Sequence, residues 1–134
     1  MCSSDLSALV DMAWHTAAEG VDPVEFEAAT LKRLGMPKAI VMRHASPHFL
    51  HVFSGEGYSA GYYSYMWSEV LDADAFAAFE EAGDPFDPAT AERLKSEIYS
   101  TGGTRDPGEL YVAFRGRLPS VEPLLKKRGL NDAA

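Results

Sequence analysis

Three tyrosines near the middle of the chain have a type and spacing suited to binding a peptide or stabilising an oxyanion. They are Tyr58, Tyr62 and Tyr65, with Gly61 among them. Projected at 100° per residue, the three phenols fall within an arc of about 60° on a helix. A neutral phenol donates a hydrogen bond without carrying charge, so it can stabilise negative charge on a substrate oxygen. The spacing leaves a second interpretation open, in which the tyrosines only pack along a helix edge with their hydroxyls in water.

The four histidines make a weaker case for metal chemistry. His44 and His48 have the i, i+4 spacing of a helical metal site. However, Ser46-Pro47 lies between them and disfavours a helix, and no glutamate follows His44 as a general base. A metal site built by His44, His48 and His51 is a third hypothesis. His51, close before the glycines, is the better functional candidate, whereas His15 is expected to be a solvated or hydrogen-bonded residue on the flank of the first helix.

Composition narrows the possible partners and activities. The 134 residues include 12 Lys and Arg against 20 Asp and Glu, and the net charge of −8 excludes a nucleic-acid backbone as a partner. Cys2 is the only cysteine, which excludes an internal disulfide and a thiolate metal cluster. No apolar run is long enough to span a bilayer, so we expect a cytoplasmic location and no membrane partner. The sequence patterns of nucleotide-binding loops and of serine hydrolases are absent.

The elements that must position these residues are mostly helices. Helices are predicted over residues 6–17, 22–35, 62–71, 87–98, 106–114 and 120–129. Aspartate followed by proline starts three of them, because the carboxylate can cap the first turn and proline fits its first position. Residues 39–57 lack this pattern, and both short strands and an ordered loop fit them. The expected fold is mainly α, in one continuous unit with a glycine-rich loop.

Two stretches of the sequence contain motifs that resemble those of a known protein family. The first runs from Phe49 to Trp67 and contains His51, the glycines and the three tyrosines. The second comprises Gly102–Asp106, Leu110-Tyr111, Phe114–Arg117 and Arg128–Leu130. Both resemble the thimet oligopeptidase and peptidyl-dipeptidase family of zinc metallopeptidases. The resemblance covers residues 7–130 of what is expected to be a single partial catalytic domain, residues 1–134, whereas residues 1–6 are expected to be foreign to the family.

The resemblance implies a helical C-terminal segment of a zincin-type catalytic domain that hydrolyses short peptides. In the family a zinc-bound water is activated at an HExxH helix, and a downstream glutamate also holds the zinc. This chain contains no HExxH, so we expect it to provide no metal ligand and to be inactive alone. Zinc would belong to the complete enzyme. The expected partners are a short peptide substrate and the missing N-terminal part of the same catalytic domain.

The resemblance also implies a role for individual residues of the first stretch. Tyr65 matches a tyrosine that stabilises the oxyanion, which makes it the expected catalytic residue. Substrate binding is expected of His51, Tyr58, Tyr62 and the glycine loop with Gly55 and Gly57. Glu56 lies inside this loop, whose length varies within the family.

A different class of function is also compatible with the residues. The chain could be a stand-alone acidic helical module that binds a peptide or protein without hydrolysing it. A partial domain should expose a large apolar face, whereas an independent module should unfold cooperatively as a monomer.

Overall fold

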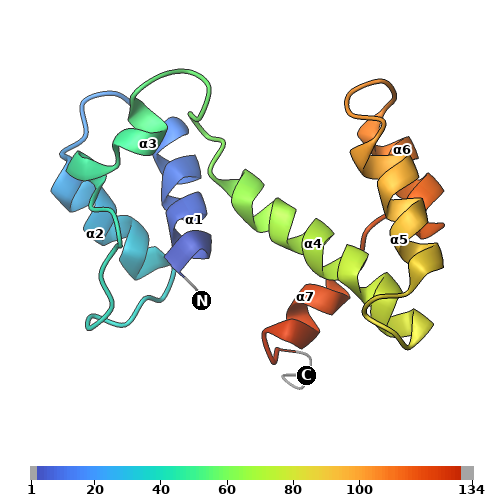
Figure 1. Ribbon diagram of the computed structural model, residues 1–134. Helices are drawn as coiled ribbons and strands as arrows, with labels where there is room; N and C mark the ends of the chain where they lie inside the picture. The colour runs from blue at the N-terminus through green and yellow to red at the C-terminus, as the bar shows by residue number, and fades with distance from the viewer. Residues whose placement is uncertain (1–2, 131–134) are drawn as a thin grey trace. The chain divides into compact units, whose positions relative to one another are not determined.

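The computed structural model describes residues 3–130, which form helices joined by turns and contain no strand (Figure 1). The described chain divides into two compact units, with the boundary between Trp67 and Ser68. The expectation of a mainly α fold is confirmed. Helix α4 (Tyr63–Ala82) begins in the first unit and continues into the second.

The first unit contains four helices besides the start of α4. They are α1 (Ser3–His15), α2 (Pro23–Arg33), the 3-10 helix η1 (Ser46–His48) and α3 (Leu50–Phe53). Helix α2 begins as predicted, because the Asp22 carboxylate accepts hydrogen bonds from the backbone N–H groups of Val24 and Glu25, each at 2.9 Å. Pro23 occupies the first helical turn, where a missing N–H costs nothing. The start of α2 is therefore set locally.

The core of the first unit joins α1 and α3 with the segment that precedes α3. Its buried members are Leu6, Val10, Met42, Phe49 and Val52. Beside this core, the indole Nε1 of Trp14 donates a hydrogen bond to Ser46 Oγ at 2.8 Å. The backbone N–H and the hydroxyl of Ser46 both donate to the Glu27 carboxylate, at 2.5 and 2.7 Å. The buried Ser46 therefore connects α1, η1 and α2.

Of the two structures that fit residues 39–57, the short strands are wrong. Residues 46–48 form η1 and residues 50–53 form α3, with turns and irregular backbone around them. Phe49 and Val52 are both fully buried at a spacing of three residues, which is a helical and not a strand period. Pro47 lies in the first turn of η1, so no continuous α-helix carries His44 and His48 together.

The second unit contains most of α4 and the remaining helices. These are α5 (Pro88–Leu94), the π-helical segment η2 (Lys95–Tyr99), α6 (Pro107–Arg115) and α7 (Glu122–Lys127). Helices α5 and α6 begin where the Asp-Pro pairs predict: Asp87 accepts a hydrogen bond from the backbone N–H of Thr90 at 2.7 Å, and Asp106 caps α6 in the same way. In η2 the backbone N–H of Ser100 donates to the carbonyl of Lys95 at 2.9 Å, the i to i+5 pattern of a π turn.

Helix α4 is longer than its predicted range of 62–71. It continues to Ala82 and ends before Gly83, whose φ of +80° is the left-handed conformation typical of a helix terminus. Asp72 and Asp74 interrupt the apolar pattern at the point where the prediction stops. Asp74 is nevertheless fully buried, because other helices supply partners for its charge.

Asp74 is the centre of a polar network in the second unit. Its carboxylate accepts hydrogen bonds from the Tyr111 hydroxyl and from Arg117 Nη2, both at 2.7 Å. The Arg115 Nε donates to the Asp74 backbone carbonyl at 3.1 Å, and the Arg115 guanidinium also forms two hydrogen bonds to the Glu81 carboxylate. Burial acts to raise the pKa of Asp74, but the hydrogen bonds from Tyr111 and Arg117 outweigh it and hold the pKa below its usual value. The buried carboxylate is therefore charged and fully partnered at neutral pH.

Candidate functional site

Four aromatic side chains of the first unit form one cluster, which we call the tyrosine cluster: His51, Tyr58, Tyr62 and Tyr65. The imidazole centroid of His51 lies 4.7 Å from the ring of Tyr58, 5.4 Å from Tyr62 and 5.8 Å from Tyr65. The rings of Tyr62 and Tyr65 are 5.0 Å apart. The structure thus brings together the histidine and the three tyrosines singled out from the sequence.

Tyr58 reaches the cluster from a turn and not from the helix face on which the 100° projection places it with Tyr62 and Tyr65. Residues 56–60 form a turn and α4 begins only at Tyr63, so Tyr58 does not lie on the helix that carries Tyr65. The prediction of a single helical stripe is therefore wrong. The turn instead folds Tyr58 back against His51, the residue just after the start of α3.

A hydrogen bond inside the cluster joins the hydroxyl of Tyr65 to the imidazole of His51. The Tyr65 hydroxyl lies 3.1 Å from His51 Nε2. When Nε2 carries a proton, it donates to the phenol oxygen and leaves the phenol O–H free to donate to another oxygen. Tyr65 is 44% exposed and Tyr58 is 53% exposed, so a ligand from solvent can reach both side chains. The cluster therefore offers accessible, neutral hydrogen-bond donors on a packed support.

The glycine loop has open space where side chains of Gly55 and Gly57 would lie. A Cβ placed on Gly55 or Gly57 would have no heavy atom within 4 Å, and neither residue has a positive φ. A side chain would therefore fit at both positions, so glycine is not sterically required there. Their backbone is open to approach by another molecule.

Gly61 differs from its neighbours, because its backbone is close to that of Tyr58. Its N–H donates to the Tyr58 carbonyl at 3.0 Å, and a Cβ on Gly61 would lie 3.2 Å from the same oxygen. The Tyr58 carbonyl and the Gly61 Cα belong to the backbone of one tight turn, so rotation of a side chain cannot relieve this contact. The position therefore tolerates an added methyl group poorly.

We expect Gly61→Ala to shift this turn and to lower the free energy of unfolding by about 1 kcal/mol. Gly57→Ala is the matched control and should leave stability unchanged or slightly higher, because the added methyl meets nothing and the unfolded chain loses freedom. Thermal unfolding followed by circular dichroism measures both. Equal stability of the two variants would contradict the tight approach at Gly61.

Two residues of α1 contact the turn at residues 56–60. The sequence analysis did not place them in the site. The fully buried carboxylate of Asp11, on α1, accepts hydrogen bonds from the backbone N–H groups of Ala60 and Tyr62, at 3.1 and 2.9 Å. His15 Nδ1 lies 2.8 Å from the same carboxylate. His15 is thus hydrogen-bonded to Asp11 at an exposed position, as one of its two expected states. No local pattern of the sequence places Asp11 in the site, since at 100° per residue it lies outside the apolar face of the first helix.

The described residues do not fit a zinc site. Within residues 3–130, no group of three or more His, Cys, Asp or Glu side chains lies close enough to hold a metal ion. His44 instead stacks on Phe49 with 5.5 Å between ring centroids, and the His51 ring is engaged with the tyrosines. Cys2 lies outside the described residues. No chemical step can therefore be derived from a metal held by these side chains.

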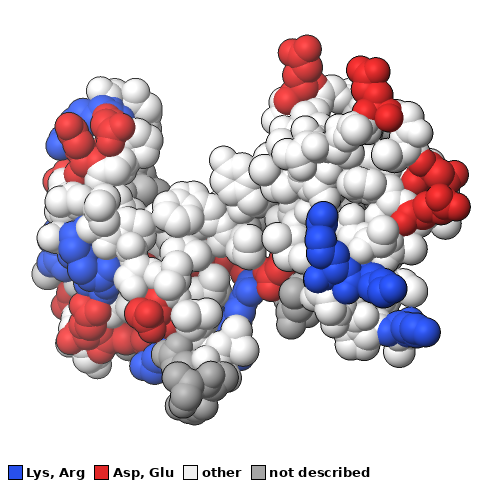
Figure 2. Space-filling view, turned by 180° about the vertical axis from the view of Figure 1, so that it is seen from behind, with Lys and Arg blue, Asp and Glu red and all other residues white. Residues whose placement is uncertain are grey.

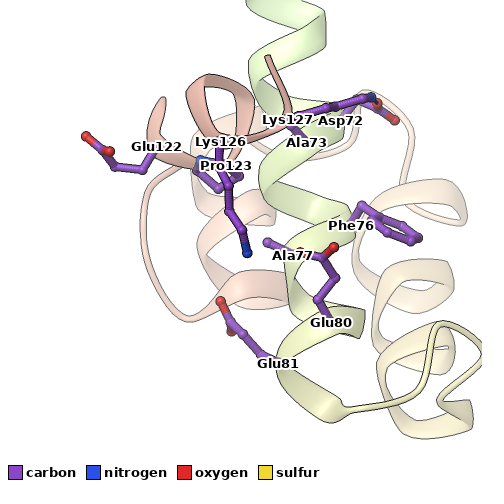
Figure 3. Close-up of a pocket in the computed structure, with 10 residues that line it drawn as sticks. All are labelled: Asp72, Ala73, Phe76, Ala77, Glu80, Glu81, Glu122, Pro123, Lys126 and Lys127. Atoms are coloured by element: carbon purple, nitrogen blue, oxygen red, sulfur yellow. Dashed lines mark ion pairs between the residues drawn. The ribbon is translucent and has the colours of Figure 1, made fainter. Parts of the chain in front are cut away.

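A groove of about 830 Å³ lies in the second unit between α4 and α7 (Figure 3). Its lining residues are Asp72, Ala73, Phe76, Ala77, Glu80, Glu81, Glu122, Pro123, Lys126 and Lys127. Figure 3 shows the Lys126 side chain extending toward Glu80 and Glu81. The lining contains no serine, threonine, cysteine or histidine, and none of the residues predicted to bind substrate. The groove is therefore not the catalytic candidate.

The surface carries charges of both signs. Figure 2 shows Lys and Arg side chains in separate groups among Asp and Glu on one face, without a continuous basic band across it. Among helices of residues 3–130, none combines the length and the hydropathy needed to cross a bilayer.

Comparison with known proteins adds a family to this geometry. Residues 1–130 match the sequence model of peptidase family M3. The chain is 50% identical to oligopeptidase A of Haemophilus influenzae over 86 residues, which is 63% of this chain and 12% of that protein. It is 38% identical to dipeptidyl carboxypeptidase of Escherichia coli over 130 residues, 93% of this chain and 19% of that protein. It is also 53% identical to probable cytosolic oligopeptidase A of Arabidopsis thaliana over 89 residues, 64% of this chain and 13% of that protein. The chain thus spans between about an eighth and a fifth of these relatives.

Proposed function

Because this chain belongs to peptidase family M3, we propose that it supplies the substrate-binding and oxyanion-stabilising face of a zinc metallopeptidase that hydrolyses oligopeptides. The observation that carries the proposal is the tyrosine cluster, in which the Tyr65 hydroxyl lies 3.1 Å from His51 Nε2 at an exposed site. The names of the relatives, oligopeptidase A and dipeptidyl carboxypeptidase, support peptides as substrates.

In this proposal Tyr65 is the catalytic residue. Negative charge develops on the carbonyl oxygen of the scissile peptide when an oxygen nucleophile adds to its carbon. The Tyr65 O–H donates a hydrogen bond to that oxygen, and it does so more strongly in the transition state than to the neutral carbonyl. A proton on His51 Nε2 is donated to the phenol oxygen, which orients the phenol proton outward and polarises it.

The other members of the cluster bind the substrate in this proposal. Tyr58 and Tyr62 offer phenols beside His51, so that successive carbonyl groups of an extended peptide can accept hydrogen bonds from them. The open backbone at Gly55 and Gly57 lets the peptide approach closely. These contacts orient the scissile bond toward Tyr65, which lowers the entropic part of the barrier.

We further propose that the zinc ligands lie in a preceding N-terminal part of the same catalytic domain. Two observations support this partner. The described side chains do not fit a metal site, and the chain matches only 12–19% of the relatives' length.

We propose a cytoplasmic location for the enzyme; of two Arabidopsis relatives that are equally 53% identical, one is named a probable cytosolic and the other an organellar oligopeptidase A. Fusion of the native protein to a fluorescent protein tests this location directly. Fluorescence at a membrane or in a secreted fraction would contradict it.

We expect the purified chain to hydrolyse no peptide, with or without added zinc. A chimera in which this chain replaces the aligned segment of the E. coli dipeptidyl carboxypeptidase should hydrolyse short peptides and lose activity with a chelator. Reading the native gene upstream of Met1 gives an independent check, because an in-frame HExxH helix is expected there. Chelator-sensitive hydrolysis by the chain alone would contradict the proposal.

The same experiment separates the proposal from a stand-alone binding module. A module should unfold cooperatively as a monomer, bind a peptide through the tyrosine cluster and give an inactive chimera. A partial domain should bind a hydrophobic dye such as ANS in isolation and lose that binding in the chimera.

A further inference from the structure

The carboxylate of Asp11 holds the backbone of the turn that leads into α4. Its two oxygens bind different N–H groups: Oδ1 accepts from Ala60 at 3.1 Å and Oδ2 accepts from Tyr62 at 2.9 Å. The Ala60 N–H also lies 3.3 Å from His15 Nδ1, a longer contact. The side chain is fully buried, so these bonds are not shared with bulk water. A buried carboxylate that accepts two backbone N–H groups has a fixed orientation, and it fixes the orientation of the backbone in turn.

The conformation of Ala60 shows that this turn needs to be held. Ala60 has a φ of +54° and is the one residue other than glycine with a positive φ in the described part of the chain. A side chain with a Cβ is strained in the left-handed region and stays there only when its surroundings determine it. The bond from the Ala60 N–H to Asp11 is such a determinant.

Two further groups lie close to the Asp11 carboxylate. His15 Nδ1 lies 2.8 Å from Oδ1 and comes from the next turn of α1. Tyr62 immediately precedes the 20-residue helix α4, whose N-terminal end carries the positive end of the helix dipole. The carboxylate therefore acts on α4 as a cap supplied by another helix.

We propose that Asp11 is a positioning residue for the tyrosine cluster: its carboxylate fixes the backbone from Ala60 to Tyr62 and thereby directs Tyr62 and Tyr65 toward His51. Its effect on catalysis rests on the function proposed above, whereas its effect on the turn does not. Asp11 touches neither the Tyr65 hydroxyl nor any open part of the cluster. Its role is thus to place the groups that bind and react.

The first test measures amide hydrogen exchange in the active enzyme that contains this chain, without any substitution. The amides of Ala60 and Tyr62 should exchange at least about tenfold more slowly than in an unstructured peptide. In Asp11→Asn, one of these two amides should lose most of its protection, because one carboxylate oxygen becomes an amide N–H₂ that cannot accept and the remaining oxygen serves only one N–H. The amide of Val52 in the nearby core should keep its protection. Unprotected Ala60 and Tyr62 amides in the unsubstituted enzyme would overturn the proposal, whether or not Asp11→Asn folds.

The second test compares kinetics with a charge-matched control. Asp11→Asn should lower kcat/KM by about 10- to 100-fold, since small displacements of catalytic groups have effects of this size. Glu19→Gln removes an exposed carboxylate from the loop after α1 and should leave kcat/KM unchanged. Unchanged kcat/KM in a folded Asp11→Asn, in an enzyme where Tyr65→Phe is impaired, would overturn the positioning role. If Tyr65→Phe has no effect, the proposed function fails instead, and the exchange measurement alone decides whether Asp11 holds the turn.

Discussion

Tyr65→Phe is expected to lower kcat for peptide hydrolysis by about 10²- to 10³-fold in the enzyme completed by its zinc-bearing part. This is the usual cost of removing one donor that stabilises a developing oxyanion. KM should change little, because the hydroxyl acts mainly on the transition state. The ring remains in the variant, so its contacts with His51 and Tyr62 are retained and the fold should not suffer. Steady-state kinetics with a fluorogenic oligopeptide measures both constants.

Tyr63→Phe is the matched control for this prediction. Tyr63 is the first residue of α4 and is 54% exposed, and its hydroxyl is not among those that face His51. The control removes the same atom from the same helix and should keep kcat within about twofold. A rise in KM without a fall in kcat for Tyr65→Phe would assign Tyr65 to ground-state binding rather than to stabilisation of the oxyanion.

Asp74→Ala should lower the free energy of unfolding of the second unit by about 3–5 kcal/mol. The substitution leaves Arg117 and the Tyr111 hydroxyl without the buried carboxylate that both contact at 2.7 Å. The buried Arg115 guanidinium, whose Nε lies 3.4 Å from Asp74 Oδ2, also loses this partner and keeps only Glu81 as an ion-pair partner. Loss of one partner of a buried ion pair has an effect of this size. Urea denaturation followed by circular dichroism gives the value.

Asp72→Ala provides the comparison within the same helix. Asp72 is exposed and its carboxylate lies 3.5 Å from Lys127 Nζ, so its loss should cost no more than about 1 kcal/mol. Similar losses from the two substitutions would contradict the assignment of Asp74 as the organising charge of the second unit.

The Asp74 network makes part of the free energy of unfolding sensitive to acid. The pKa of Asp74 in the folded chain lies below its ordinary value of 3.8, so the unfolded chain binds the proton first as pH falls. The stabilisation from Asp74 is therefore fully present above pH 3.8 and is lost progressively as pH falls through the folded pKa. In Asp74→Asn this part of the pH dependence should disappear. Stability measured between neutral and acidic pH in both proteins checks it.

Local signals account for much of what the sequence predicted correctly. The Asp-Pro pairs at Asp22, Asp87 and Asp106 place the starts of α2, α5 and α6, because a helix cap depends only on the next few residues. The mainly α fold follows from these signals and from the apolar period. The gathering of the tyrosines was likewise expected from their spacing, although the turn at Tyr58 was not.

What the sequence did not predict depends on contacts between distant residues. The bond from Tyr62 to Asp11 joins positions 51 residues apart, and no local pattern announces it. The second half of α4 was missed for the same reason, since Asp74 is compatible with burial only when Arg117 and Tyr111 arrive from α6 and beyond. Residues 46–48 and 50–53 are helical because Phe49 and Val52 face one core, which a short, mixed pattern does not reveal. The roles of the cluster residues stay predictions.

The π turn at Lys95–Tyr99 bears on how the lengths of related chains can differ. A π turn contains one residue more than the α-helical turn it replaces, and here it follows α5 directly and leads into the turn that precedes α6. Loss of a single residue here would restore an ordinary helical turn, and the residues from α6 onward could keep their contacts with Asp74. The segment is thus a place where evolution can add or delete one residue without rebuilding the second unit.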